Sequence, residues 1–413
     1  MRIQILPAII LLLLSVLTDA YIISDIRRLC ARAIRNTVTW IYSLISLACY
    51  VLVIIMLAWP KKDPTEPILT PMWLLFIYLS VYIPKIVYAF LSLIGRIFLR
   101  QKPAQSKWDL IVGMTMALIL FVSLWSGTIY TRNIIEVNNV DVYSDRLPES
   151  FDGLRILQFS DLHAGTWGND TTFVSELVDS INAQQADLVV FTGDFVNRVA
   201  NELEPFVPVL SRIKAPMGVY GVLGNHDYGG YAEWPDSTGI PKNVNRLKDL
   251  IRKTGMKLLC NETTMLRNDK DSLALIGVEN WGEPPFNQLG DLVKAYAPDS
   301  VPSVALNDTV FKVLLTHNPN HWDQVVREIS NVDLSMAGHT HAMQAMFEVA
   351  GHRWSPASWK YPQWGGLYES QCKKGQPMYL YVNIGAGEVG YPARIGVARP
   401  EINVITLRRN KEE

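Results

Sequence analysis

The chain has 413 residues, of which 49% are hydrophobic, 19% are charged and four are cysteine, a composition that excludes a disordered chain, a coiled coil and a disulfide scaffold. The net charge of −1 hides an asymmetry, because residues 1–135 carry 13 basic and 5 acidic side chains while the remaining 278 residues carry 25 and 34. The acidic C-terminal part argues against nucleic-acid binding, which requires a basic surface.

Four apolar runs dominate the first 130 residues. Each is about 20 residues long, which is enough for a helix to cross a hydrocarbon core of about 30 Å. We therefore predict an all-α transmembrane region over residues 1–130, with four spans at about 3–23, 38–59, 71–94 and 110–130. Residues 1–20 leave an alternative open, because Arg2, an apolar stretch and Thr18-Asp19-Ala20 are also typical of a cleaved signal peptide.

Basic residues between the spans predict the orientation. They form two groups, Arg27, Arg28, Arg32 and Arg35 between the first and second spans, and Arg96, Arg100, Lys102 and Lys107 between the third and fourth. Lysine and arginine are retained on the cytoplasmic side, so both groups are expected there. The chain after residue 130 is then expected on the outer face of the inner (cytoplasmic) membrane, whether or not residues 1–20 are removed.

One ionisable residue, Lys85, lies inside the third apolar run, next to Pro84. We expect its long side chain to reach toward the nearer interface, or the span to end close to Pro84. A functional role for Lys85 is the less favoured interpretation.

After residue 130 the apolar runs shorten to strand length. They predict strands at 154–160, 188–192, 219–223, 273–278, 313–316 and 334–337, with helices between several of them at 172–183, 204–213, 243–254 and 322–329. Further strands are expected at 347–354, 378–383 and 401–407. We therefore predict a connector at 131–150 and an α/β domain at 151–409, in which two mixed β-sheets are sandwiched by helices.

Polar side chains that favour metals follow the ends of these strands. The candidate donors are Asp161, His163, Asp194, Asn225, His317, His339 and His341. On an extended strand end, residues i and i+2 point the same way, so Asp161 with His163 and His339 with His341 are expected to form two pairs. Carboxylate and imidazole donors suit Mn, Fe, Zn or Ni, and seven donors imply two bridged ions. Two adjacent ions are typical of phosphoester hydrolysis.

The order of the motifs adds a family resemblance. D-x-H, G-D, G-N-H-D, a lone His and G-H-T-H follow one another in this sequence. This order resembles the calcineurin-like metallophosphoesterases, above all their membrane-anchored bacterial branch, over about residues 150–409. The resemblance implies a four-layer α/β/β/α fold and a dinuclear centre that takes two divalent ions, with manganese favoured over iron, zinc and nickel.

The resemblance also implies a role for each candidate residue. Asp161, His163 and His341 would bind the first metal, Asn225, His317 and His339 the second, and Asp194 would bridge them. A hydroxide between the ions would attack the phosphorus in line. His226 would contact the substrate phosphate or protonate the leaving oxygen, and Asp227 would orient the His226 ring.

Other positions carry weaker expectations. In much of this branch G-H-T-H is followed by two glycines, whereas this chain has Ala342-Met343-Gln344, which puts the shape of the pocket wall in question. Residues 279–281 are given no definite role, and residues 359–368 are expected either to form a wall over the metals or to be a packed surface loop. His321 and His352 are expected to be surface or packing residues. Cys260 and Cys372 either pair in an oxidising compartment or remain free.

The favoured function is a membrane-anchored, metal-dependent phosphoesterase that acts as a phosphodiesterase, phosphomonoesterase or pyrophosphatase. A lipid-linked or envelope substrate is expected from the location in the membrane alone. No nucleic-acid partner and no obligate protein partner are expected. The alternative is a membrane sensor or scaffold whose metallophosphoesterase domain is catalytically silent.

Overall fold

The computed structural model describes residues 5–60, 62–98, 108–284, 288–296 and 310–410, and the chain divides into two compact units. The membrane unit comprises residues 1–61, 68–130 and 390–393. The α/β unit comprises residues 62–67, 131–389 and 394–413. The loop 62–67 belongs to the α/β unit because the Arg198 guanidinium donates to the backbone carbonyl of Asp63 at 3.3 Å and to that of Glu66.

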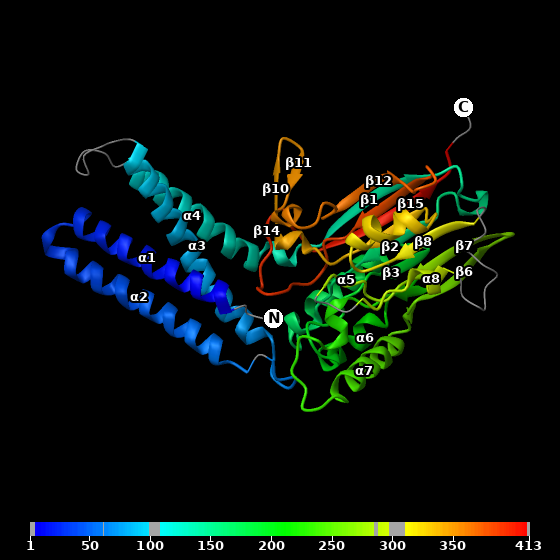
Figure 1. The fold of residues 1–413 in the computed structure, drawn as a ribbon, viewed down its shortest axis with the longest axis horizontal. Helices are drawn as coiled ribbons and strands as arrows, with labels where there is room; N and C mark the ends of the chain where they lie inside the picture. The colour runs from blue at the N-terminus through cyan, green and yellow to red at the C-terminus, as the bar shows by residue number, and fades with distance from the viewer. Residues whose placement is uncertain (1–4, 61, 99–107, 285–287, 297–309, 411–413) are drawn as a thin grey trace. The chain divides into compact units, whose positions relative to one another are not determined.

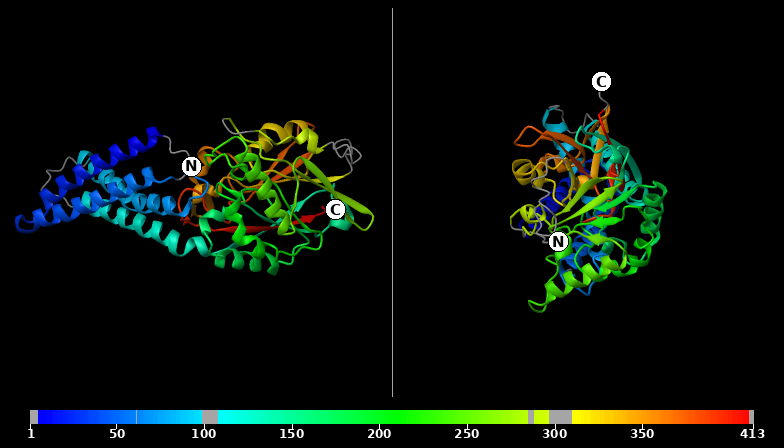
Figure 2. Two further views of the ribbon diagram at one scale, coloured as in Figure 1. Left: turned by 90° about the horizontal axis from the view of Figure 1, so that it is seen from below. Right: turned by 90° about the vertical axis from the view of Figure 1, so that its right-hand side faces the viewer.

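Four long helices form the membrane unit (Figures 1 and 2). They are α1 (Ile5–Leu29), α2 (Arg32–Ala58), α3 (Leu69–Phe98) and α4 (Trp108–Ile129), and all four are long and apolar enough to cross a membrane. Helix α1 continues past the predicted end of its span at residue 23, so Arg27 and Arg28 lie in its last turn. Arg100, Lys102 and Lys107 lie outside the described residues.

Lys85 does not lie where the sequence suggested. Helix α3 continues through Pro84, and the Lys85 ammonium lies 3.2 Å from the Asp19 carboxylate of α1 and 3.0 Å from the Ser46 hydroxyl of α2. The expectation of a side chain reaching the interface, or of a span ending at Pro84, was therefore wrong. Lys85 finds its counter-ion within the bundle, because a charge at this depth is stabilised by a partner.

Two six-stranded sheets form the core of the α/β unit (Figure 1). The first has the order β1 (Glu136–Tyr143), β15 (Glu401–Arg408), β2 (Arg155–Phe159), β3 (Leu188–Phe191), β4 (Val219–Gly221) and β5 (Lys257–Leu258). The second has the order β12 (Gly366–Gln371), β13 (Pro377–Val382), β9 (Leu334–Ala337), β8 (Phe311–Leu315), β7 (Asp271–Gly277) and β6 (Glu262–Asn268). A small third sheet has the order β11 (His352–Trp354), β10 (Ala345–Val349) and β14 (Ile395–Gly396).

The layers follow from which strand faces are apolar. Leu188 and Val190 of β3 pack against residues of β7, β8 and β9 in a core between the two large sheets. Leu157 of β2 and Val189 of β3 face the opposite way and pack against α5 (Thr172–Ala183) and α7 (Gly239–Lys253). The outer face of the second sheet is covered by α8 (Leu292–Tyr296) and by the segment 322–329. The predicted four-layer α/β/β/α fold is confirmed.

Several predicted elements differ in detail. Residues 131–150, expected to be a connector, contain β1, which pairs in parallel with β15 at the edge of the first sheet. Residues 347–354 form two strands joined by a tight turn instead of one strand. The segment 322–329 is a π-helix (Trp322–Val326) followed by the short α9 (Arg327–Ile329). The segment 204–213 contains the end of a 3-10 helix (Ala200–Phe206) and the four-residue α6 (Val207–Leu210).

Candidate metal centre

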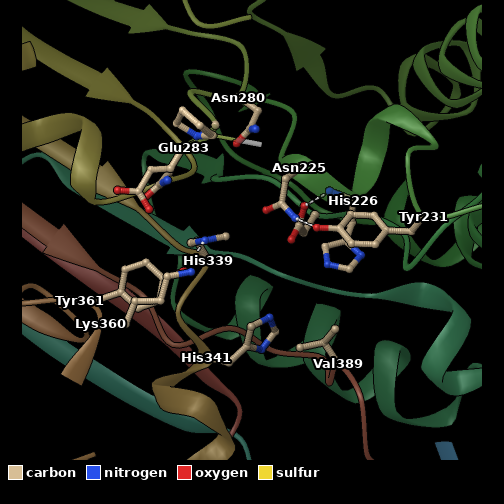
Figure 3. A pocket seen from close by; sticks show the side chains of 14 residues that line it. Asn225, His226, Tyr231, Asn280, Glu283, His339, His341, Lys360, Tyr361 and Val389 are labelled. Carbon is tan, nitrogen blue, oxygen red and sulfur yellow. Dashed lines mark hydrogen bonds between the residues drawn. The ribbon is translucent and has the colours of Figure 1, made fainter. Parts of the chain in front are cut away.

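Five loops that follow the carboxyl ends of strands carry the candidate donors. Strands β2, β3 and β4 run parallel in the first sheet, and β8 and β9 run parallel in the second, so each set of loops emerges at one edge. Ligand sites of α/β sheets lie at such edges. Figure 3 shows side chains from these loops around one cavity, among them Asn225, His226, His339 and His341.

A first group consists of Asp161, His163 and His341. The Nε2 atoms of the two histidines lie 3.0 Å apart, and His341 Nε2 lies 3.2 Å from Asp161 Oδ1. The donor atoms of all three residues lie within 4.8 Å of one another, which is close enough for one ion. The residues that the family resemblance gave to the first metal are thus brought together.

A second group consists of Asp194, His317 and His339, with Asn225 beside it. His317 Nε2 lies 3.1 Å from Asp194 Oδ2, 3.1 Å from His339 Nδ1 and 3.1 Å from Asn225 Oδ1. Asp194 Oδ2 also lies 3.6 Å from His163 Nε2 of the first group. The Asp194 carboxylate therefore lies between the two groups, in the position expected of a bridging ligand.

The backbone at these donors is left-handed rather than extended. Five of the seven candidate donors have positive φ, namely Asp161 (53°), His163 (44°), Asp194 (63°), His339 (78°) and His341 (51°). The argument that Asp161 and His163 pair because they lie on an extended strand end was therefore wrong, although the residues do meet. Strained dihedrals of this kind concentrate at functional sites, where the surrounding structure holds them.

Glycines within the motifs allow the loops to approach one another. A Cβ atom on Gly224 would overlap the Asp194 carboxylate, and one on Gly338 would overlap the Asp161 carboxylate and the Ser160 hydroxyl. A glycine directly before Asn225 and before His339 is thus a steric requirement of the site. The G-N-H-D and G-H-T-H motifs therefore contain both the donor residues and the glycines that this close packing requires.

Two of the histidines, His317 and His339, are oriented by hydrogen bonds to the ring nitrogen that faces away from the other donors. His317 Nδ1 lies 2.8 Å from the Thr192 carbonyl, to which it donates, so its Nε2 faces the site and offers a lone pair once a cation displaces the Nε2 proton. His339 Nε2 lies 3.0 Å from the Tyr361 hydroxyl, which leaves Nδ1 facing inward. Lone pairs that meet at about 3 Å next to two buried carboxylates are the environment that a divalent cation satisfies. The residues present therefore fit two divalent ions.

His226 and Asp227 divide their roles differently from the prediction. His226 Nδ1 donates to the Asn197 carbonyl at 2.6 Å, so this carbonyl and not Asp227 orients the ring. The Asp227 carboxylate instead accepts from the backbone N–H groups of Asp194 (3.0 Å) and Gly224 (2.9 Å). Asp227 thus fixes the loops that carry Asp194 and Asn225.

Burial and neighbouring charges together shift the pKa values of the buried ionisable groups. Burial alone would raise the pKa of Asp161, but the neighbouring His341 and His317 outweigh it and lower that pKa. Burial lowers and Asp194 raises the pKa of His317, with a net increase to about 9. Burial and the nearby Asp194 both raise the pKa of Asp227. Asp161 and Asp194 are thus held as carboxylates at neutral pH, the form that binds cations.

The cavity above the donors has a volume of about 360 Å³. Polar and apolar atoms share its wall about equally, and the polar lining residues include Asn318 and, as Figure 3 shows, Asn280, Glu283, Lys360 and Tyr361. The two segments left open by the sequence, 279–281 and 359–368, therefore both contribute to the wall. A cavity of this size with several convergent polar side chains has room for a phosphoryl group and a neighbouring group.

Sequence reasoning missed Tyr231. Its ring stacks on His226 with centroids 4.0 Å apart, and its hydroxyl accepts a hydrogen bond from Asn225 Nδ2 at 2.7 Å. This contact turns the Asn225 Oδ1 atom toward His317. An isolated tyrosine outside the recognised motifs gives no signal in a single sequence.

The remaining expectations concern residues outside the centre. His321 is buried, packs on Trp281 and has a pKa lowered to about 3 by burial, and His352 is exposed on β11. Both therefore lie outside the donor groups, as expected.

Cys260 and Cys372 do not form a disulfide with each other, and both are free thiols.

Comparison with known proteins places the chain. Residues 154–343 match the family described as calcineurin-like phosphoesterase, and residues 1–132 match the probable calcineurin-like phosphoesterase transmembrane domain. The chain is 28% identical to the metallophosphoesterase YkuE of Bacillus subtilis over 67% of its own length and 86% of that protein. It is 29% identical to the metallophosphoesterase Cj0846 of Campylobacter jejuni over 67% of its own length and 64% of that protein.

A third relative, a transmembrane protein with metallophosphoesterase domain from Danio rerio, is 26% identical over 82% of this chain and 75% of its own length. These matches define the class: residues 154–343 form a calcineurin-like phosphoesterase domain. The chain combines this domain with a four-helix transmembrane domain and has a possible metal site of aspartate and histidine.

Proposed function

We propose that this chain is a metal-dependent phosphoester hydrolase with a dinuclear centre. The observation that carries the proposal is the convergence of two donor groups, Asp161, His163 and His341 on one side and Asn225, His317 and His339 on the other, with Asp194 between them. Two divalent cations, when bound, lower the pKa of water toward neutrality and neutralise charge on a phosphoryl group. Manganese is the metal we favour.

The chain's own residues supply the other parts of the reaction. His226 lines the cavity, and because its Nδ1 donates to the Asn197 carbonyl, its Nε2 is the atom that can hold a proton near a leaving oxygen. Tyr231 keeps the ring in place by stacking. Lys360 and Asn280 also line the cavity, where they can contact substrate oxygens. Asp227 acts through the backbone of the donor loops.

We propose a phosphomonoester, phosphodiester or pyrophosphate at the inner-membrane surface as the substrate class, with a lipid-linked or envelope compound favoured by the membrane anchorage. The polar side chains that line the cavity, among them Asn280, Glu283 and Lys360, favour a substrate that places its phosphorylated polar group there. We further propose that the α/β unit lies on the outer face of the cytoplasmic membrane, as the basic groups at Arg27 to Arg35 predict.

The proposal is tested by the Asp194→Asn variant of the full chain. Loss of the bridging carboxylate should lower the turnover of an aryl phosphodiester with added Mn²⁺ by at least a thousandfold, because both donor groups lose a shared charge. The exposed Asp179→Asn serves as the matched control and should retain wild-type turnover. Equal turnover by Asp194→Asn and wild type, with both proteins folded by circular dichroism, contradicts the mechanism.

The alternative of a silent sensor or scaffold predicts a different result. Wild-type protein that binds Mn²⁺ with the stoichiometry of two ions, yet turns over none of a broad panel of phosphomonoesters, phosphodiesters and pyrophosphates, would favour it. The Asp19–Lys85 pair inside the membrane unit is the observation that keeps this alternative in view, since charged residues within a bilayer are often functional.

A further inference from the structure

The β10–β11 hairpin collects exposed apolar side chains. In the described part of the α/β unit, six of the twelve large hydrophobic residues that are exposed lie between residues 343 and 367. Val349 is 74% exposed and Trp359 is 80% exposed, which leaves nearly the whole of each side chain in contact with solvent. Such a concentration of apolar surface is typical of an interaction site.

The pairing of the two strands separates an apolar face from a charged face. Phe347 pairs with Trp354 and Val349 with His352, so these side chains point to one side. Glu348 pairs with Arg353 and points to the other side, where the two form an ion pair of 2.9 Å. The hairpin is thus amphipathic, and the charges on its polar face neutralise each other.

Aromatic rings extend the apolar face beyond the hairpin. Phe347 stacks on Trp354 with centroids 6.1 Å apart, and Trp354 meets the edge of Trp359 at 5.7 Å. We call Phe347, Val349, Trp354 and Trp359 the aromatic face. Its base is held rigidly, because β10 pairs with β14 and the Ser355 hydroxyl donates to the Ala342 carbonyl at 2.6 Å. Figure 1 shows β10 and β11 projecting from the rest of the α/β unit.

The chain itself limits how far this hairpin can lie from a bilayer. Pro392 belongs to the membrane unit, where its carbonyl accepts a hydrogen bond from Thr128 in the last turn of α4 at 2.6 Å. Ile395 of β14, which pairs with Ala345 of β10, follows three residues later. Three residues span at most about 10 Å, so chain connectivity keeps Ile395 at the base of the hairpin within that distance of Pro392.

We propose that the aromatic face is a membrane-docking surface that inserts into the headgroup layer of the bilayer in which the four helices are anchored. Tryptophan and phenylalanine on one face of an otherwise polar element suit that layer, where an apolar ring and a hydrated edge are both satisfied. Because the four helices anchor the chain in the bilayer, the bilayer is present at a high effective concentration near the aromatic face. A modest apolar area is then sufficient for binding to the bilayer. The surface holds the α/β unit in one orientation toward the lipid and is independent of the proposed reaction.

The test uses the full chain in proteoliposomes, with an environment-sensitive fluorophore on Val349→Cys in a background in which Cys30 and Cys260 are replaced by serine. A fluorophore on Lys374→Cys is the matched control, because Lys374 lies exposed in the turn between β12 and β13 of the same unit. Nitroxide lipids labelled near the headgroup should quench the Val349 fluorophore at least twofold more strongly than the Lys374 fluorophore. Trp359→Cys should behave like Val349→Cys.

Three outcomes would overturn the proposal. Equal lipid quenching at Val349, Trp359 and Lys374 shows that the aromatic face does not touch the bilayer. A blue shift at Val349 that depends on the amount of protein per liposome, without lipid quenching, assigns the face to a second copy of the chain. A blue shift that appears only after another membrane protein is reconstituted alongside assigns it to a protein partner.

Discussion

Met343 occupies a backbone conformation that residues with side chains rarely adopt. Its φ is 47°, and its neighbours Ala342 and Gln344 have φ of 50° and 55°. A left-handed residue other than glycine costs about 1 to 2 kcal/mol. This chain therefore holds a left-handed backbone at Ala342 and Met343, the two positions at which the family resemblance led us to expect glycine.

Replacing Met343 by glycine should therefore stabilise the protein. Glycine relieves the strain of the left-handed backbone but also raises the entropic cost of folding. The net gain in the free energy of unfolding is about 0.5 to 1 kcal/mol. The Met343 side chain is 44% exposed, so its removal loses little buried surface. Thermal unfolding in detergent, followed by intrinsic fluorescence, should show a higher midpoint for Met343→Gly.

Ala345→Gly is the matched control for this prediction. Ala345 lies two residues away at an extended φ of −140°, where glycine should lower the unfolding midpoint. If Met343→Gly lowers the midpoint as much as Ala345→Gly, the left-handed conformation carries no strain and the argument is wrong.

At the site, the sequence predicts the identity of the donor residues but not the roles of the residues that hold them. The seven donors were predicted because motif order preserves the identity of ligands. The roles of Asp227 and Tyr231 were not, because they depend on backbone N–H groups and a ring that the fold brings in from other loops. The left-handed φ of Asp161 and His163 was also missed, since neither residue type requires that conformation.

At the scale of elements, a polar cluster joins the first three membrane helices. The Asp19 carboxylate of α1 accepts hydrogen bonds from Tyr50 at 2.7 Å and Tyr82 at 2.8 Å, and from Tyr42. The Lys85 ammonium completes the cluster and lies 4.5 Å from the ring centroids of Tyr42 and Tyr82. Both carboxylate oxygens are thus saturated, which indicates a cluster that fixes helix packing.

Removing either Asp19 or Lys85 alone should destabilise the helix bundle more than removing both. Asp19→Leu leaves the Lys85 ammonium inside the bundle without its counter-ion and should destabilise the bundle by about 3 to 5 kcal/mol, whereas Asp19→Leu combined with Lys85→Met should recover most of that loss. Unfolding midpoints of the wild type, the two single variants and the double variant in one detergent measure the coupling. Additive effects of the two single variants would show that the pair does not fix the packing.

Elements differ in how far sequence foretells them. The buried strands β3, β8 and β9 were predicted because each is a continuous apolar run. The edge strands β1 and β12 were not, since β1 mixes Val137, Val140 and Val142 with polar residues and β12 is largely exposed. Edge strands form through backbone pairing with a neighbour, which leaves a weaker apolar pattern.

At the scale of the whole molecule, the asymmetry of charge separates two environments. The excess of basic residues lies in the membrane-spanning part, and the acidic excess lies in the part that carries Asp161 and Asp194. The loop 62–67 between α2 and α3 belongs to the α/β unit through its contacts with Arg198. A four-span topology requires this loop and the chain after α4 to lie on the same side of the membrane, and these contacts support that requirement.

The orientation proposed for the chain therefore predicts opposite accessibility for two positions. In a background with Cys30 and Cys260 replaced by serine, Lys374→Cys in the α/β unit should react with a membrane-impermeant thiol reagent on intact cells. Ala31→Cys, in the exposed turn between α1 and α2 that carries the first basic group, should react only after the membrane is permeabilised. The reverse pattern would place the α/β unit in the cytoplasm and contradict the orientation. Reaction of both positions on intact cells would contradict the four-span topology itself, because two sides of a membrane cannot both face the reagent.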